Sequence, residues 1–309
     1  MTSPILHLST EELWSALDDI NPVDVLVEQL IGGAGWTAEG QLHPWPEVGS
    51  IPSAELAMYE ESCTGAKCLI PVSSLRQVRA AALATLAARE LLAPGVVTAA
   101  VLGSGLAAQL QLTVLAKHVS DVSHVAVCAG NDGGWSPVEP RVLDQLDLAG
   151  IGLSVTSGVN EAVLGANLVI ATDAGLGRLE IGQLAKGAVV INAGGVDLPD
   201  AVVDGVDQVY VDDASLLDEN SHRYFVTMHR AAQNSGLHRN GRKLKGWHRR
   251  RLIEADLGAL LSGSHAGRQR LDDVVLVELL STNLPDAHLT ARLHRAALDR
   301  GLGMRVSGS

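Results

Sequence analysis

A chain of 309 residues can hold two domains, and 47% hydrophobic with 19% charged residues is the composition of a globular protein with a large core. The net charge of −12 argues against nucleic acid as a general partner, and no apolar run reaches the roughly 20 residues that span a bilayer. The N-terminus has no basic segment followed by an apolar one, so we expect a cytoplasmic protein.

Only 3% of the residues are aromatic, so the core must consist of Leu, Val, Ile and Ala, as in parallel sheets covered by helices. The three cysteines, Cys63, Cys68 and Cys128, are too few for a disulfide framework and lack a second pair of metal ligands nearby. We expect buried or half-buried thiols and no metal site.

The N-terminal part predicts two helices and an irregular segment. Residues 9–12 (Ser-Thr-Glu-Glu) form a capping box that opens a helix, and Asn21-Pro22 begins a second helix that Gly32-Gly33 ends. Residues 34–54 are rich in Gly, Pro and Trp, so we expect them to be irregular.

A hairpin and a long helix should follow. Residues 56–62 and 68–72 can pair as strands around Thr64-Gly65. Residues 73–92 begin with two serines that can cap an alanine-rich helix, and Pro94-Gly95 then interrupts the chain. We expect the domain boundary there.

The most informative segment comes directly after this boundary. Residues 96–102 (VVTAAVL) are an apolar run typical of a buried strand, and they lead through Gly103 and Gly105 into a helix-forming stretch. In such a turn the first glycine permits the tight bend and the second lets the backbone approach a pyrophosphate, to which the helix N-terminus offers free N–H groups. The strand, the G-x-G-x-x-A turn and the helix predict a site for a nicotinamide dinucleotide.

Apolar runs and possible helices alternate through the rest of the chain. This alternation predicts a doubly wound parallel sheet of the α/β class. The remaining runs are 124–128, 151–155, 167–171, 188–192, 208–211 and 274–280. An amphipathic helix after Pro285 presents Leu289, Leu293, Ala296 and Ala297 on one face and ends at Gly301.

Several ordered motifs together resemble the ornithine cyclodeaminase/μ-crystallin family of NAD(P)-dependent enzymes. The matching segments are Thr64-Gly65, residues 78–82 (VRAAA), residues 103–111 (GSGLAAQLQ), residues 161–172 with their E-A-x-x-G-A-N-L-V pattern, and residues 187–197 (GAVVINAGGVD). Their order and spacing over about residues 60–305 are similar to those of the family.

The resemblance implies a Rossmann domain over residues 94–283 and a second, α+β domain. The second domain would combine residues 1–93 with 284–309, bind the substrate and form a homodimer. NAD or NADP would be the cofactor. The cofactor-binding residues would be Gly103, Gly105, Ala107, Ala108, Asn131, Thr172 and Ala193.

The resemblance also implies two residues for the chemistry. Enzymes of this family pass a hydride between nicotinamide and the α-carbon of an amino acid or imine. Arg79 matches the arginine that holds the substrate carboxylate, which suits the planar guanidinium. Asp197 matches the catalytic aspartate that handles the amine or imine proton. The alternatives are an exposed arginine on an alanine-rich helix and an aspartate that shapes a turn or caps a helix.

The chain also departs from the family pattern. Residues 30–55 contain no counterpart of the family's N-terminal substrate-binding arginine or of its G-x-K lysine, and Lys67 is out of place for that role. The family's P-G-K is replaced by residues 198–201 (Leu-Pro-Asp-Ala). Ornithine cyclisation is therefore not expected. The segment around Asn131 offers no ribose-binding acid before Asp132, so the choice between NAD and NADP stays open.

Residues 220–253 carry nine Lys and Arg and no acidic residue. Such a segment is either a solvated loop or a surface that docks an anionic group or an acidic partner. His43, His222 and His229 are candidates to supply a proton in place of the missing lysine, or they have no chemical role.

These observations favour an imine reductase or amino-acid dehydrogenase with an unusual substrate in specialised biosynthesis. The alternatives are a catalytically silent dimer of this fold that binds a ligand or partner, and a cyclodeaminase of a diamino acid.

Overall fold

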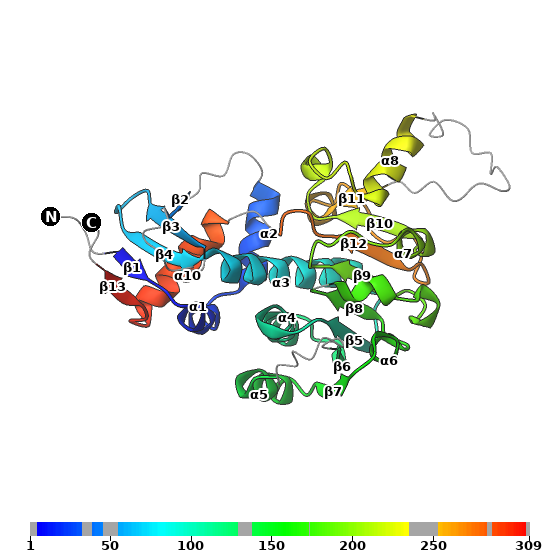
Figure 1. The fold of residues 1–309 in the computed structure, drawn as a ribbon, viewed down its shortest axis with the longest axis horizontal. Coiled ribbons are helices and arrows are strands. Elements are labelled where there is room, and N and C mark those ends of the chain that lie inside the picture. Colours follow the sequence, from blue (N-terminus) through cyan, green and yellow to red (C-terminus); the bar gives the residue numbers. More distant parts are fainter. Residues whose placement is uncertain are drawn as a thin grey trace. The chain divides into compact units, whose positions relative to one another are not determined.

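The computed structural model describes residues 5–32, 39–45, 55–128, 138–172, 174–234, 253–282 and 286–306. It divides the chain into two compact units. Unit 1 consists of residues 1–82 and 283–309, and unit 2 consists of residues 83–282. The division falls inside helix α3 (Val72–Leu91), which Figure 1 shows in cyan. The expected domain boundary at Pro94 stays a prediction.

Unit 1 contains a mixed sheet with the strand order β13-β1-β4-β3-β2. Its strands are β1 (Ile5–His7), β2 (Gly40–Pro44), β3 (Leu56–Glu61), β4 (Lys67–Pro71) and β13 (Met304–Val306), and its helices are α1 (Thr10–Leu17), α2 (Pro22–Gly32), the first half of α3, and α10 (Ala287–Asp299). The predicted hairpin is confirmed, since β3 and β4 pair antiparallel. The capping box is confirmed as well: Ser9 Oγ accepts from the Glu12 N–H, and Glu12 Oε2 accepts from the Ser9 N–H.

The prediction of an irregular segment at 34–54 is wrong for residues 40–44, which form β2 and pair antiparallel with β3. Gly40 lies so close to β3 that an added Cβ would be 2.4 Å from the Glu60 carbonyl oxygen. Pro44 is tolerated because β2 is an edge strand, where a ladder donor can be missing. Glycine and proline therefore have positional roles in this strand and do not mark a loop.

Unit 2 contains an eight-stranded sheet with the order β11-β10-β12-β9-β8-β5-β6-β7 (Figure 1). Every neighbouring pair is parallel, so the predicted α/β fold with a doubly wound parallel sheet is confirmed. The strands are β5 (Val97–Leu102), β6 (Val122–Cys128), β7 (Gly152–Thr156), β8 (Leu168–Ala171), β9 (Val189–Asn192), β10 (Gln208–Val211), β11 (Ile253–Asp256) and β12 (Val275–Glu278). The half-exposed edge strand β11 was not predicted, because it lacks an apolar run.

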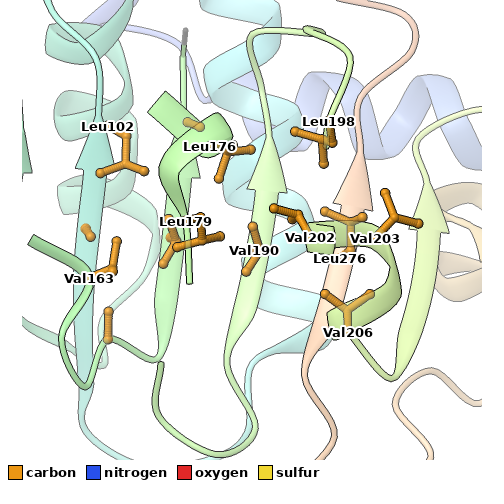
Figure 2. Close-up of a cluster of buried hydrophobic side chains, with 14 of the residues drawn as sticks. Leu102, Val163, Leu176, Leu179, Val190, Leu198, Val202, Val203, Val206 and Leu276 are labelled. Atoms are coloured by element: carbon orange, nitrogen blue, oxygen red, sulfur yellow. The ribbon is translucent and has the colours of Figure 1, made fainter. Parts of the chain in front are cut away.

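The inner strands of this sheet are buried on both faces, which explains their continuous apolar runs, whereas the edge strands β7 and β11 are partly exposed. Figure 2 shows one side of the core, where Leu102, Val190 and Leu276 of the strands meet Val163 and Val202 of the helices. The helices of unit 2, besides the end of α3, are α4 (Gly105–His118), α5 (Pro140–Leu148), α6 (Val159–Val163), α7 (Asp200–Gly205), α8 (Tyr224–Asn234) and α9 (Leu257–Leu261), with 3-10 turns at Ala174–Arg178, Ile181–Gln183 and Ala214–Leu217.

The strand order reverses between β5 and β8. From β5 the chain continues to β6 and β7 on one side, whereas β8 and β9 lie on the other side. In open parallel sheets, ligands bind outside the carboxyl ends of the strands at such a switch point. No helix among the described residues is long and apolar enough to cross a membrane.

Candidate functional site

The glycine turn lies at the switch point, between β5 and α4. Gly103 and Gly105 have φ values of 138° and 65°, which only glycine adopts readily. Among the described residues, apart from the chain neighbours of Gly105 and the backbone of α4, no atom lies within 4 Å of the place where a Cβ on Gly105 would be. The Ser104 side chain does not cap α4, so it leaves the first N–H groups of this 14-residue helix to other acceptors. Open space above a helix N-terminus fits the pyrophosphate of a dinucleotide.

Other predicted cofactor residues lie at the same edge of the sheet. Thr172 follows β8, and its N–H donates to the Leu102 carbonyl at 2.8 Å. Ala193 follows β9, and its N–H donates to the Ala171 carbonyl at 2.9 Å. Since β9, β8 and β5 are neighbours, the structure brings Gly103, Thr172 and Ala193 together across three strand ends.

The remaining predicted cofactor residues differ in their positions. Ala107 is half-buried in the first turn of α4, and the Ala108 side chain is buried in the core. Asn131 and the acidic Asp132 lie outside the described residues. The roles of all seven residues in cofactor binding stay predictions.

Asp197 lies in the loop between β9 and α7, at the carboxyl edge of the same sheet, and its side chain is exposed. The next residue, Leu198, is 5% exposed and points into the core (Figure 2). Pro199 is the N-cap residue of α7, so the alternative that Asp197 caps this helix is wrong. The Asp197 carboxylate is thus exposed to solvent, while the adjacent Leu198 side chain holds the loop in the core.

Beneath this loop lies a group of three polar side chains, which we call the Glu278 cluster: Glu278, Arg223 and Asn192. Glu278 and Asn192 are paired residues at the ends of the adjacent strands β12 and β9. Glu278 Oε2 accepts hydrogen bonds from Arg223 Nη1 at 3.0 Å and from Asn192 Nδ2 at 2.9 Å. Burial raises the pKa of Glu278 to about 8, although Arg223 and Asn192 favour its ionised form.

Sequence reasoning missed the Glu278 cluster. In the sequence, Arg223 belongs to the basic segment 220–253 and Glu278 lies inside an apolar run, so neither is distinguished as a site residue. A usable signal was present, because a single carboxylate in a run such as VVLVELL must find a buried partner.

Arg79 lies on α3 in unit 1 and is 7% exposed, so the alternative of an exposed helix residue is wrong. Its Nη1 donates to Asp286 Oδ2 and, at 3.4 Å, to Gln29 Oε1. The other carboxylate oxygen of Asp286 accepts from the N–H groups of His288 and Leu289 at 3.0 and 2.9 Å and caps α10. The arginine predicted to bind a substrate carboxylate is therefore paired with a carboxylate of its own chain.

Neither Lys67 nor the three candidate histidines make a described contact with Asp197 or the glycine turn. Lys67 pairs with Glu60 at 3.3 Å, and His43 and His222 are exposed. His229 accepts a hydrogen bond from the Ile253 N–H at its Nδ1, which gives it a structural role at β11.

Most of the basic segment, residues 235–252, lies outside the described residues. Of its described arginines, Arg223 is buried in the Glu278 cluster and Arg230 pairs with Asp218 at 2.5 Å. Arg223 therefore does not belong to an open basic surface, whereas Arg230 is partly exposed beside an acidic residue. In the described part of the chain, no three His, Cys, Asp or Glu side chains are grouped to hold a metal ion. Cys68 and Cys128 are buried as expected, whereas Cys63 is exposed and the expectation of a buried thiol is wrong there.

A parallel sheet with an open glycine turn at its switch point defines a protein with a Rossmann-type dinucleotide-binding fold. The chain belongs to the ornithine cyclodeaminase/mu-crystallin family, whose model matches residues 50–292. The family resemblance inferred from the motifs is thereby confirmed.

The chain is also similar to individual proteins. N-((2S)-2-amino-2-carboxyethyl)-L-glutamate dehydrogenase of Staphylococcus aureus is 22% identical over 288 residues, which are 91% of this chain and 79% of the relative. The crystal structure of CmnK matches over 100% of both chains with a TM-score of 0.69 and 18% identity. The Thermococcus litoralis Δ1-pyrroline-2-carboxylate reductase, in complex with NADH and L-proline, matches over 98% of this chain and 100% of that chain with a TM-score of 0.61 and 15% identity.

Proposed function

We propose that the chain is an NAD(P)-dependent oxidoreductase that acts on a C–N bond, as an imine reductase or amino-acid dehydrogenase. One observation carries this proposal: the open glycine turn and the exposed Asp197 lie at the same carboxyl edge of one parallel sheet. Two of the similar proteins are a dehydrogenase of a secondary amine and a reductase of a cyclic imine, as their names state.

The proposed chemistry divides between cofactor and protein. NAD(P)H supplies or accepts the hydride at the α-carbon when it is bound. The protein has to hold the dinucleotide, and the N–H groups at the start of α4 would bind its pyrophosphate across the space that Gly105 leaves open. Asp197 would hold the proton that the imine nitrogen gains on reduction, or that the amine loses on oxidation.

The substrate-binding and dimerisation domain would consist of residues 1–93 and 284–309, which include Arg79. Arg79 would contact a substrate carboxylate only in competition with Asp286, which already accepts from its Nη1. The family's N-terminal substrate-binding arginine and its G-x-K lysine have no counterpart in residues 30–55 of this sequence. We therefore propose a substrate that differs from ornithine at its carboxylate end, and we propose a role in specialised biosynthesis.

The pairing of Arg79 with Asp286 also favours the second candidate, a silent dimer that keeps the cofactor fold and binds a ligand or partner. The two candidates differ in turnover, and cofactor binding distinguishes them only if the silent dimer has also lost the nucleotide. A cyclodeaminase of a diamino acid, the third candidate, would release ammonia without net consumption of cofactor.

The first test is titration of the purified protein with NADH and NADPH, followed by nicotinamide fluorescence. The variant Gly105→Asp should abolish binding, because it places a carboxylate where the pyrophosphate is proposed to lie. Gly150→Asp is a matched control, since Gly150 also has a positive φ of 70° and open space around its Cβ position but precedes β7 at the opposite edge of the sheet. If wild type binds neither nucleotide, the oxidoreductase proposal is wrong.

The second test is turnover with the nucleotide that binds. The screen should include Δ1-pyrroline-2-carboxylate for reduction, and L-amino acids and N-(2-amino-2-carboxyethyl)-L-glutamate for oxidation. Asp197→Asn should lower kcat by about 100-fold or more, as expected for loss of a group that transfers a proton. Asp200→Asn is the control and should keep wild-type activity, because Asp200 is also an exposed aspartate but is the first residue of α7.

A further inference from the structure

The Glu278 cluster lies directly beneath the loop that carries Asp197. We propose that Arg223, Asn192 and Glu278 act as positioning residues, which fix this loop and thereby place the Asp197 carboxylate for proton transfer. This inference rests on the proposed function, because it gives the cluster a role in the reaction assigned to Asp197.

The geometry of the hydrogen bonds supports this role. Arg223 uses Nη1 for Glu278 and Nη2 for the carbonyl oxygen of Gly195. Asn192 uses Nδ2 for Glu278 Oε2 and, at 2.7 Å, for the carbonyl oxygen of Val196. The two carbonyls that immediately precede Asp197 are therefore held by two side chains that share one carboxylate oxygen.

The loop also packs against the cluster at van der Waals distance. Gly195 has a φ of +64°, and a Cβ there would be 3.5 Å from Arg223 Nη2 and 3.4 Å from Thr282 Oγ1. On the far side of Asp197, the buried Leu198 anchors the chain in the core. Asp197 thus lies between two fixed points, which limits the positions that its carboxylate can take.

Burial of the Glu278 cluster lowers the stability of the folded chain, which a purely structural role would not require. Glu278 is 1% exposed and Arg223 is 7% exposed, and a buried polar group loses its hydration. Glu278 Oε1 and Asn192 Oδ1 are buried and have no hydrogen-bond partner among the described residues. Apolar side chains at such positions are often as stable or more stable. The hydrogen bonds to the two carbonyls supply a function that an apolar core would not.

The charges around Glu278 make this arrangement sensitive to pH. Besides Arg223, the carboxylates of Asp197 and Asp212 act on Glu278 and favour its neutral form, as burial does. When Glu278 ionises, it adds a negative charge near Asp197 and changes the strength of its hydrogen bonds from Arg223 and Asn192. Loss of the Glu278 titration should therefore change the pH profile of the reaction.

The test uses Arg223→Lys and Glu278→Gln in the full chain. Lysine keeps the positive charge but cannot reach Glu278 and the Gly195 carbonyl with a planar fork, whereas glutamine keeps an acceptor of the same shape and cannot ionise. Arg268→Lys is the matched control, because Arg268 binds the carbonyl oxygens of Leu91 and Asp273, both at 2.8 Å, at the amino ends of the strands.

Two readouts decide the proposal. Hydrogen exchange of peptides that cover residues 189–199 should become about tenfold faster in Arg223→Lys and stay unchanged in Arg268→Lys. On the substrate found in the screen, Arg223→Lys should lower kcat by about 10- to 100-fold with KM changed less than about twofold, as expected for a misplaced catalytic group. Glu278→Gln should keep most of kcat but lose an ionisation that wild type shows in its kcat–pH profile.

Unchanged exchange in Arg223→Lys would show that the loop does not depend on the cluster and would overturn the proposal. Faster exchange with unchanged kcat in Arg223→Lys would show that the cluster has no role in catalysis. An equal decrease of kcat in Arg268→Lys would show the same. If wild type binds nucleotide but turns over no substrate, the proposed function fails, whereas the exchange experiment still decides whether the cluster fixes the loop.

Discussion

Replacement of Asp286 should be among the most destabilising single changes in unit 1. Asp286 Oδ2 accepts from the buried Arg79, and Oδ1 caps α10 through the N–H groups of His288 and Leu289. Removal of one partner of a buried charged pair costs about 3–5 kcal/mol, and loss of an N-cap side chain costs about 1 kcal/mol. Asp286→Ala should therefore lower the free energy of unfolding by about 4–6 kcal/mol.

Asp286→Asn separates the two contributions, because asparagine is as good an N-cap as aspartate but carries no charge. It should cost about 1 kcal/mol less than Asp286→Ala, and a second change, Arg79→Met, should restore much of the loss by removing the uncompensated charge. Urea unfolding followed by circular dichroism measures all three variants. Asp286→Asn with the stability of wild type would refute the reasoning, since Arg79 would then need no carboxylate partner.

Three further predictions follow from single groups. Gly187→Ala should lower Tm strongly in a thermal unfolding assay, because its Cβ would be 2.1 Å from the Leu271 carbonyl oxygen at a φ of +74°. The raised pKa of Glu278, about 8 against 4.5, means that the folded chain holds this proton more tightly than the unfolded chain. The stabilisation that comes from this bound proton is complete below about pH 4.5 and disappears as the pH rises through 8. The free energy of unfolding of Glu278→Gln, relative to that of wild type, should therefore increase between pH 5 and 8.5, by on the order of 4 kcal/mol at most. A difference in urea unfolding that stays constant over this pH range would contradict the prediction. The exposed Cys63 should react with iodoacetamide in the native protein, whereas Cys68, whose pKa burial raises to about 12, should react only after unfolding, as mass spectrometry of the labelled peptides can show.

The parts of the fold that local chemistry specifies could be predicted from the sequence. The capping box at Ser9, the hairpin before α3 and the strand before Gly103 each depend on residues within a few positions of one another. The alternation of apolar runs then sufficed for a parallel sheet, because strands buried on both faces need no polar alternation.

The parts that depend on distant pairs could not be predicted. Arg223 and Glu278 are 55 residues apart in the sequence, and Arg79 and Asp286 are 207 apart. A motif can assign Arg79 to carboxylate binding, but only the fold shows that a carboxylate of the same chain already contacts it. Likewise, only the fold distinguishes the buried Arg223 from the other arginines of a basic segment.

The sheet of unit 1 joins strands from both ends of the chain. β1, at residues 5–7, lies between β4 and β13, and β13 comes only at residues 304–306. During synthesis on the ribosome, β1 emerges first but lacks this neighbour until about 300 further residues have been translated. Unit 2 is complete by residue 282 and can form its core earlier. Synthesis from the N-terminus towards the C-terminus therefore favours an order in which the parallel sheet of unit 2 folds first and β13 joins the sheet of unit 1 afterwards.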